Sequence, residues 1–285
     1  SAYTKLIFSD YELDEKLFEY YTNRDFKGLL YCKNEFNQDI SELPNGVTHL
    51  IFGHSFNQNV SNLPSFLIYL TFGWNFNQDV SNLPLFLTHL VFGHEFNQDV
   101  SILPPFIIHL TFDSMFFNQD VSMLPHDLIY LEVGSHFNKD VSELPHNLTH
   151  LTFGYYFNQD VSNLPQGITH LVFGYNFNQD ISVLPHNLTH LTLGEKFNQK
   201  YNIPINLKYL KLYCNNSDIV NNLPNSVRIL EFDGEFNSQI DNLPTSIRKI
   251  IINKYCGYYA DLNCLPDFVE ELHLNDYYDK PILHI

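Results

Sequence analysis

A proline that follows a leucine or isoleucine returns about every 20 residues through most of the chain. The copies lie 19 to 22 residues apart, at Pro44, Pro64, Pro84, Pro104, Pro125, Pro145, Pro165, Pro185, Pro204, Pro224, Pro244 and Pro266. So constant a period is typical of a solenoid, in which each repeat is one coil that packs only on its neighbours. We therefore expect stacked coils rather than the two ordinary domains that a chain of 285 residues could form.

Residues 87–92 (LTHLVF) predict the strand of one coil. Apolar and polar residues alternate from His89 onward, so Leu90 and Phe92 would point inward. Gly93 would end the strand by giving the backbone freedom to turn, and Pro104 favours an extended return or a single 3₁₀ turn. Stacked coils would bring equivalent strands to about 4.8 Å, forming a parallel sheet. Three further inward anchors of this coil are predicted at Phe96, Val100 and Leu103.

A Phe-Asn pair opens the phrase Phe-Asn-Gln-Asp in most coils. Because an asparagine amide both donates and accepts hydrogen bonds, this column can satisfy backbone groups between neighbouring coils. A row of ligand-binding amides is the alternative. We expect a structural asparagine ladder at Asn37, Asn57, Asn77, Asn97, Asn118, Asn138, Asn158, Asn178 and Asn198.

The aspartates of the same phrase, such as Asp79 and Asp99, look like paired catalytic carboxylates. Catalysis needs one singular arrangement with separated pKa values, whereas these residues recur on every coil. We interpret them as a solvated edge or as turn-stabilising groups, with calcium bridging between adjacent coils as the alternative.

The full pattern L-x-x-L-x-F-G-x-x-F-N-Q-D-V-S-x-L-P resembles the FNIP repeat family, a leucine-rich-repeat relative of social amoebae and giant amoebal viruses. The likeness runs from about residue 26 to residue 275. The resemblance implies a leucine-rich-repeat-like, right-handed solenoid with a parallel β-sheet on the concave face, mostly β with few helices. Many members carry an N-terminal F-box, which implies substrate recognition for a ubiquitin ligase in the cytoplasm, or in the host cytoplasm for a viral protein. We find no F-box length of sequence before the first coil.

The ends of the repeat are expected to be caps. Residues 1–28 predict a strand at Lys5–Phe8 followed by a short helix to about Tyr21, since Ser9 and Glu12 match a capping box. Residues 29–275 would form about twelve coils. Residues 276–285 would cover the last coil with a strand-like run.

The outward strand positions are rich in rings, which offer a large contact area with little side-chain entropy to lose. They predict a partner-binding face. One alternative is a stacked ladder without a ligand. The other is a metal site at His150, His170 and His190, which lie on successive coils, although parallel side chains converge poorly on zinc. Stacked imidazolium groups would also repel, which would resist protonation. The predicted partner-binding residues are His49, Tyr69, His89, His109, Tyr130, His150, His170 and His190 on the strands and Trp74, His94, Tyr155 and Tyr175 just after them.

Charge and motifs narrow the function. The net charge of −17 disfavours nucleic acid, and the sequence holds no apolar run of membrane-spanning length and no signal-peptide pattern. It carries no nucleophile elbow, zinc-protease motif or phosphate loop. We expect no enzyme and no cofactor, but a protein-interaction scaffold, with a passive structural or virion-associated protein as the alternative.

The four cysteines show no metal-binding spacing. Three of them, Cys32, Cys214 and Cys256, fall at regular positions of the repeat and are expected to be thiols in a reducing compartment. A disulfide between Cys256 and Cys264 is the alternative.

Overall fold

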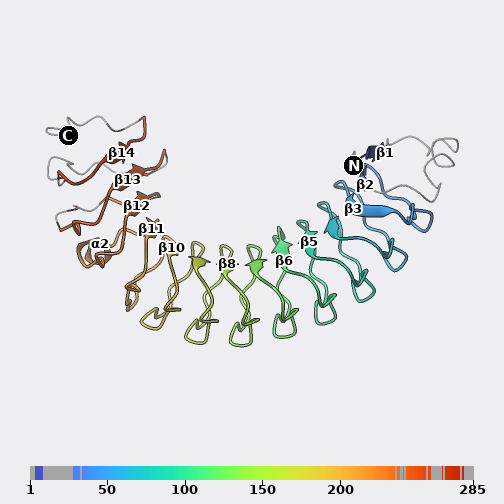
Figure 1. Cartoon of the computed structure of the whole chain (residues 1–285), viewed down its shortest axis with the longest axis horizontal. Helices are drawn as coiled ribbons and strands as arrows, with labels where there is room; N and C mark the ends of the chain where they lie inside the picture. Colours follow the sequence, from blue (N-terminus) through green and yellow to red (C-terminus); the bar gives the residue numbers. More distant parts are fainter. Residues whose placement is uncertain are drawn as a thin grey trace. The chain divides into compact units, whose positions relative to one another are not determined.

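The structure is a computed structural model that describes residues 4–8, 28–32, 34–234, 236–237, 240, 242–254, 256–257, 265, 267–276 and 278. The chain divides into two compact units, residues 1–148 and residues 149–285. In each unit, coil follows coil, with a short strand on one side of the coil and its turns on the other (Figure 1). The fold is a leucine-rich-repeat-like solenoid, as predicted.

The strands of each unit pair in parallel in the order of the sequence. Pairing partners lie about one repeat apart, so that Leu90 lies between Leu70 and Leu110. The first unit contains β1 (Thr4–Phe8), β2 (Gly28–Cys32), β3 (Val47–Ile51), β4 (Tyr69–Thr71), β5 (His89–Phe92), β6 (His109–Phe112) and β7 (Tyr130–Glu132). The second contains β8 (His150–Thr152), β9 (His170–Val172), β10 (His190–Leu193), β11 (Tyr209–Leu212), α2 (Ser217–Asn221), β12 (Ile229–Phe232), β13 (Lys249–Ile252) and β14 (Glu271–His273).

Two columns of phenylalanine fill the core. Leu90 and Phe92 are buried in β5 while His89 and Val91 are half-buried, so the predicted alternation is confirmed. Phe92 and Phe96 stack within one coil, with ring centroids 3.7 Å apart, and Phe96 stacks on Phe76 of the preceding coil at 6.1 Å. The predicted anchors Phe96, Val100 and Leu103 are all buried.

The glycine that follows many of the strands is needed for a different reason from the one predicted. Among the glycines that the structure describes, only Gly234 has a positive φ, 58°. A Cβ on Gly93 would instead lie 2.1 Å from the carbonyl oxygen of Gly73, and one on Gly194 would lie 1.9 Å from that of Gly174. Close stacking of coils, rather than freedom to turn, therefore excludes a side chain at these positions.

Hydrogen bonds run from coil to coil along the asparagine column. The backbone N–H of Asn77 donates to Oδ1 of Asn57 at 2.9 Å, and Nε2 of Gln78 donates to the same oxygen at 2.9 Å. In the second unit Asn178 donates to Asn158 in the same way, at 2.8 Å. Because each amide oxygen accepts from the next coil, we interpret this column as architecture.

The aspartates close turns within their own coils. Oδ1 of Asp79 accepts the backbone N–H of Ser81 at 2.9 Å, and Oδ2 accepts the serine hydroxyl at 2.9 Å. These hydrogen bonds hold the pKa of Asp79 below its usual value. This pattern corresponds to the turn-stabilising interpretation.

Departures from the repeat concentrate in the second unit. After β11, Cys214 is buried and Oδ1 of Asn215 accepts the backbone N–H of Asn237 at 3.1 Å, as in the asparagine column. The next residue, Asn216, caps α2, since its Oδ1 accepts the backbone N–H of Asp218 at 3.1 Å. Of the predicted caps, the strand Lys5–Phe8 is present within β1. The helix from Ser9 and the run 279–285 lie outside the described residues, and the domain limits stay a prediction.

The cysteines that the structure describes are buried. Burial raises the pKa of Cys32 to about 12 and that of Cys214 to about 12. The sulfur of Cys256 donates to the carbonyl oxygen of Phe236 at 3.5 Å. Cys264 lies outside the described residues.

Candidate functional site

The first outward strand position forms a line of half-buried rings on the sheet face, which we call the ring column. In the first unit it comprises His49, Tyr69, His89, His109 and Tyr130, and each ring faces the next at centroid distances from 5.9 to 4.1 Å. The closest pair is His109 and Tyr130, 4.1 Å apart with planes 3° apart. The parallel register of the strands produces this alignment, because equivalent side chains lie directly beside one another.

The second unit has its own section of the ring column. His150, His170 and His190 stack with both centroid distances at 4.1 Å, and Tyr209 continues the line 5.4 Å from His190. Stacked rings cannot direct their lone pairs to one point, as zinc requires. Among the described residues, no group of three or more His, Cys, Asp or Glu side chains is arranged to hold a metal.

Threonines fix the tautomer of several of these histidines. Oγ1 of Thr169 donates to the carbonyl oxygen of Thr149 at 3.1 Å and lies 2.9 Å from Nδ1 of His170. A hydroxyl has a single proton, so Nδ1 of His170 must be the donor in the second contact. The same pair of contacts occurs at Thr88 with His89 and at Thr189 with His190. In the neutral state these rings therefore carry the acceptor lone pair on Nε2.

The environment of the rings disfavours their protonation. Partial burial and the neighbouring charges of His190 and His150 lower the pKa of His170 to about 4. Burial and the ring-column histidine His49 also lower the pKa of His89, and burial and His89 lower the pKa of His109. Burial, His150 and Lys208 lower the pKa of His190. These four histidines, His89, His109, His170 and His190, are thus neutral near pH 7.

This charge state predicts a pH-dependent stability. The unfolded chain has histidine pKa values near about 6.5, so between about pH 6.5 and 4 it binds protons that folded His170 does not. The free energy of unfolding should therefore fall as pH decreases through that window. Solvent screens the partly exposed ring, so we expect about 1 kcal/mol or less from this residue.

Urea unfolding midpoints measured at about pH 7, 5.5 and 4.5 test this expectation. The variant His170→Gln should lose part of the pH dependence, and His146→Gln, which alters an exposed turn, should retain it. Equal midpoints across the window for the wild-type chain would contradict the prediction.

The predicted residues just after the strands form shorter stacks. In the first unit Trp74 and His94 lie 3.8 Å apart with planes 10° apart. In the second, Tyr155 and Tyr175 lie 4.6 Å apart with planes 4° apart. These four residues thus form two pairs beside the ring column, one in each unit.

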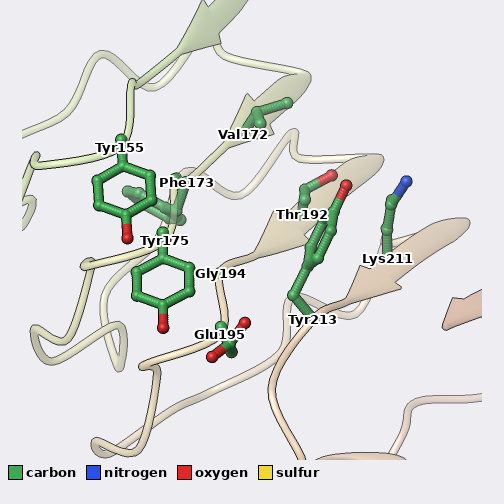
Figure 2. A pocket seen from close by; sticks show the side chains of 10 residues that line it. Tyr155, Val172, Phe173, Tyr175, Thr192, Gly194, Glu195, Lys211 and Tyr213 are labelled. Atoms are coloured by element: carbon green, nitrogen blue, oxygen red, sulfur yellow. The ribbon is translucent and has the colours of Figure 1, made fainter. Parts of the chain in front are cut away.

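A cavity of about 390 Å³, which we call the tyrosine pocket, lies beside the second pair. Figure 2 shows the rings of Tyr155 and Tyr175 on one side of Gly194 and the ring of Tyr213 on the other. Thr192, Glu195 and Lys211 supply its polar groups. Gly194 contributes only backbone to the lining between these tyrosines.

The ammonium group that lines the pocket is already paired with two carboxylates. Nζ of Lys211 lies 2.8 Å from Oε1 of Glu231 and 3.1 Å from Oδ2 of Asp233, so two carboxylates share one ammonium group. Lys211 also lies over the ring of Tyr213, 4.9 Å from its centroid. Hydrogen bonding to Glu195 raises the pKa of Tyr175.

The prediction from sequence included two tyrosines of this pocket and missed Thr192, Glu195, Lys211 and Tyr213 as site residues. A signal for Tyr213 was present: β11 pairs with β10 so that Leu212 lies opposite Leu193, and the residue that follows is tyrosine rather than glycine. The prediction also missed Phe66, Phe86 and Phe106, which are 51–61% exposed on successive proline turns.

The sequence matches a family model described as FNIP Repeat over residues 36–73, 117–156, 160–196 and 215–255, which together exceed half of the chain. No curated protein matches it. In the part of the chain that the structure describes, no helix has the length and apolar character needed to cross a membrane.

Three solved structures are similar to the chain. The giant-virus protein CroV588, described as a novel circular LRR protein, is 37% identical, with a TM-score of 0.74 over 92% of this chain. The chain spans 42% of that protein's length. Two Listeria monocytogenes proteins share the fold at 19% identity: the internalin InlF, with a TM-score of 0.62 over 92% of this chain and 83% of its own, and InlJ, with 0.57 over 86% and 62%.

Proposed function

The chain belongs to the FNIP repeat family, and we propose that it is a non-enzymatic scaffold that binds a protein partner through the ring column. One observation carries the proposal: the ring column is a continuous stack of half-buried rings in each unit. A sheet surface without a binding role would need only polar side chains at these positions. The Nε2 atoms of His89, His170 and His190 offer acceptors to a partner's donors, and the rings of the column lose little entropy on binding.

The proposal can be refined in two ways. The first is that the scaffold selects substrates for an F-box-type ubiquitin ligase; this rests on the family resemblance alone, and co-purification of the ligase's adaptor subunit with the native protein would test it. The second is that binding takes place in the cytoplasm, which the buried thiols of Cys32 and Cys214 support.

The ring column can be tested with histidine variants of one unit. A partner captured from amoebal lysate, the source that the family resemblance implies, would be produced in pure form and its dissociation constant measured by calorimetry. We expect His89→Ala combined with His109→Ala to weaken binding by at least about 10-fold, because both rings lie within the stack.

The matched control replaces two histidines on exposed proline turns, His126→Ala combined with His146→Ala, and should change affinity by less than about twofold. Circular dichroism would verify that both variants are folded. Equal effects of the two variants would show that the partner does not use the ring column. If no partner binds the wild-type chain specifically, the passive structural or virion-associated protein becomes the better interpretation.

A further inference from the structure

The tyrosine pocket is not required by the binding surface proposed above, although it lies beside it. We propose that the tyrosine pocket receives the guanidinium group of an arginine side chain from the bound protein. This inference rests on the proposed function, since it assumes that the ligand is a protein.

The shape of the pocket favours a flat group. Tyr155 and Tyr175 are parallel to within 4°, and the gap above Gly194 separates this stack from Tyr213 (Figure 2). A planar guest inserted there can lie against these rings. Guanidinium is planar and stacks on aromatic faces, which a compact ammonium group does less well.

The charges favour a cation over an anion. Lys211, the only cationic residue that lines the described pocket, is already paired with Glu231 and Asp233. Glu195 also lines the pocket, and its carboxylate can accept two parallel N–H donors from a guanidinium group. The chain's net charge of −17 further attracts a basic partner.

A lysine of the chain itself shows that the rings accept a cation. Nζ of Lys196 lies 5.3 Å from the ring centroid of Tyr175. Lys196 is exposed, and its long flexible side chain can swing aside when a guest enters. It therefore acts as a weak internal competitor, and its removal should strengthen binding of an arginine.

The test uses three end-blocked pentapeptides, Gly-Ser-X-Ser-Gly, in which X is arginine, citrulline or lysine. Citrulline keeps the planar shape of arginine without its charge. Binding to the whole chain would be followed by NMR from the signals of the tyrosine rings. We expect the arginine peptide to bind at least about 10-fold more tightly than the citrulline peptide, and more tightly than the lysine peptide.

Variants locate the binding. Tyr175→Leu and Glu195→Gln should each weaken the arginine peptide by at least about fivefold, whereas Tyr175→Phe should retain most of the affinity because it keeps the ring. Lys196→Ala should strengthen binding. Glu143→Gln removes the same charge at an exposed position of the other unit and should leave binding unchanged.

Three results would overturn the inference: equal affinity for arginine and citrulline, equal effects of Glu195→Gln and Glu143→Gln, or weaker binding after Lys196→Ala. The third would identify Lys196 as part of an anion site. Because the peptides need no natural partner, failure here leaves the ring column untouched. Conversely, unchanged partner binding in the His89 and His109 variant would reject the proposed surface without affecting the peptide result.

Discussion

Replacement of Gly93 by alanine should destabilise the chain by about 3 kcal/mol or more, a large effect for the addition of one methyl group. The new Cβ would lie 2.1 Å from the carbonyl oxygen of Gly73 and 2.5 Å from its carbonyl carbon. Both neighbours are backbone atoms, so no side-chain rotation relieves the clash. The two coils must separate, which stretches the hydrogen bond of 2.8 Å from Phe72 N–H to the Val91 carbonyl.

Urea unfolding of Gly93→Ala beside Gly257→Ala would measure this effect. A Cβ on Gly257 has its nearest neighbour at 3.9 Å, the carbonyl oxygen of Gly234, which is an ordinary contact. The control should therefore stay within about 0.5 kcal/mol of the wild-type chain. If the two variants lost equal stability, freedom of the backbone rather than coil spacing would explain the glycine.

The repeat made most of the coil predictable from sequence. The residues equivalent to Leu90, Phe92 and Phe96 are buried in coil after coil, so the pattern reports their environment many times over. The position of the glycine was predicted correctly, but the reason given for it was wrong. A close approach between coils and a left-handed backbone conformation both require glycine, so the sequence is the same in the two cases. The structure distinguishes the two reasons, because a Cβ on Gly93 would lie 2.1 Å from the carbonyl oxygen of Gly73.

Single departures were harder to interpret. The spacing of 21 residues from Pro104 to Pro125 indicates one extra residue in this coil but does not show its position. Packing places it at Asp113, because Ser114 takes the glycine position: a Cβ on Gly134 would lie 1.8 Å from its carbonyl oxygen. The buried hydroxyl of Ser114 then accepts the backbone N–H of Phe117 at 3.0 Å. The repeat pattern carries no information on such distances, so the sequence could not predict that the Ser114 hydroxyl would accept this hydrogen bond.

The two candidate sites also differ in how far the sequence could predict them. The ring column could be foreseen, since outward positions of a parallel sheet must align. The tyrosine pocket could not, because it needs Gly194 between two flanking tyrosines and a lysine already neutralised by Glu231 and Asp233. Its residues come from different positions in successive coils, so a column-by-column reading of the sequence separates them.

Replacement of Phe96 by alanine should cost about 3–5 kcal/mol, the range for a large buried aromatic side chain. Its ring is fully buried and stacks on Phe92 at 3.7 Å, on Phe76 at 6.1 Å and on Phe117 at 6.2 Å. Neighbouring coils have little room to move in and fill the space, because the Gly73 and Gly93 backbones already lie too close together to admit a Cβ.

The loss at Phe96 should weaken two interfaces at once, since each coil of a solenoid is stabilised by its contacts with both neighbours. Thermal unfolding followed by circular dichroism should therefore show both a lower midpoint and a broader transition for Phe96→Ala. Phe86→Ala removes the same group from a side chain that is 57% exposed and should change stability by no more than about 0.5 kcal/mol. Similar losses in the two variants would mean that coil-to-coil stacking of the phenylalanines does not hold the solenoid together, and its stability would then have to come chiefly from the strand and asparagine hydrogen bonds.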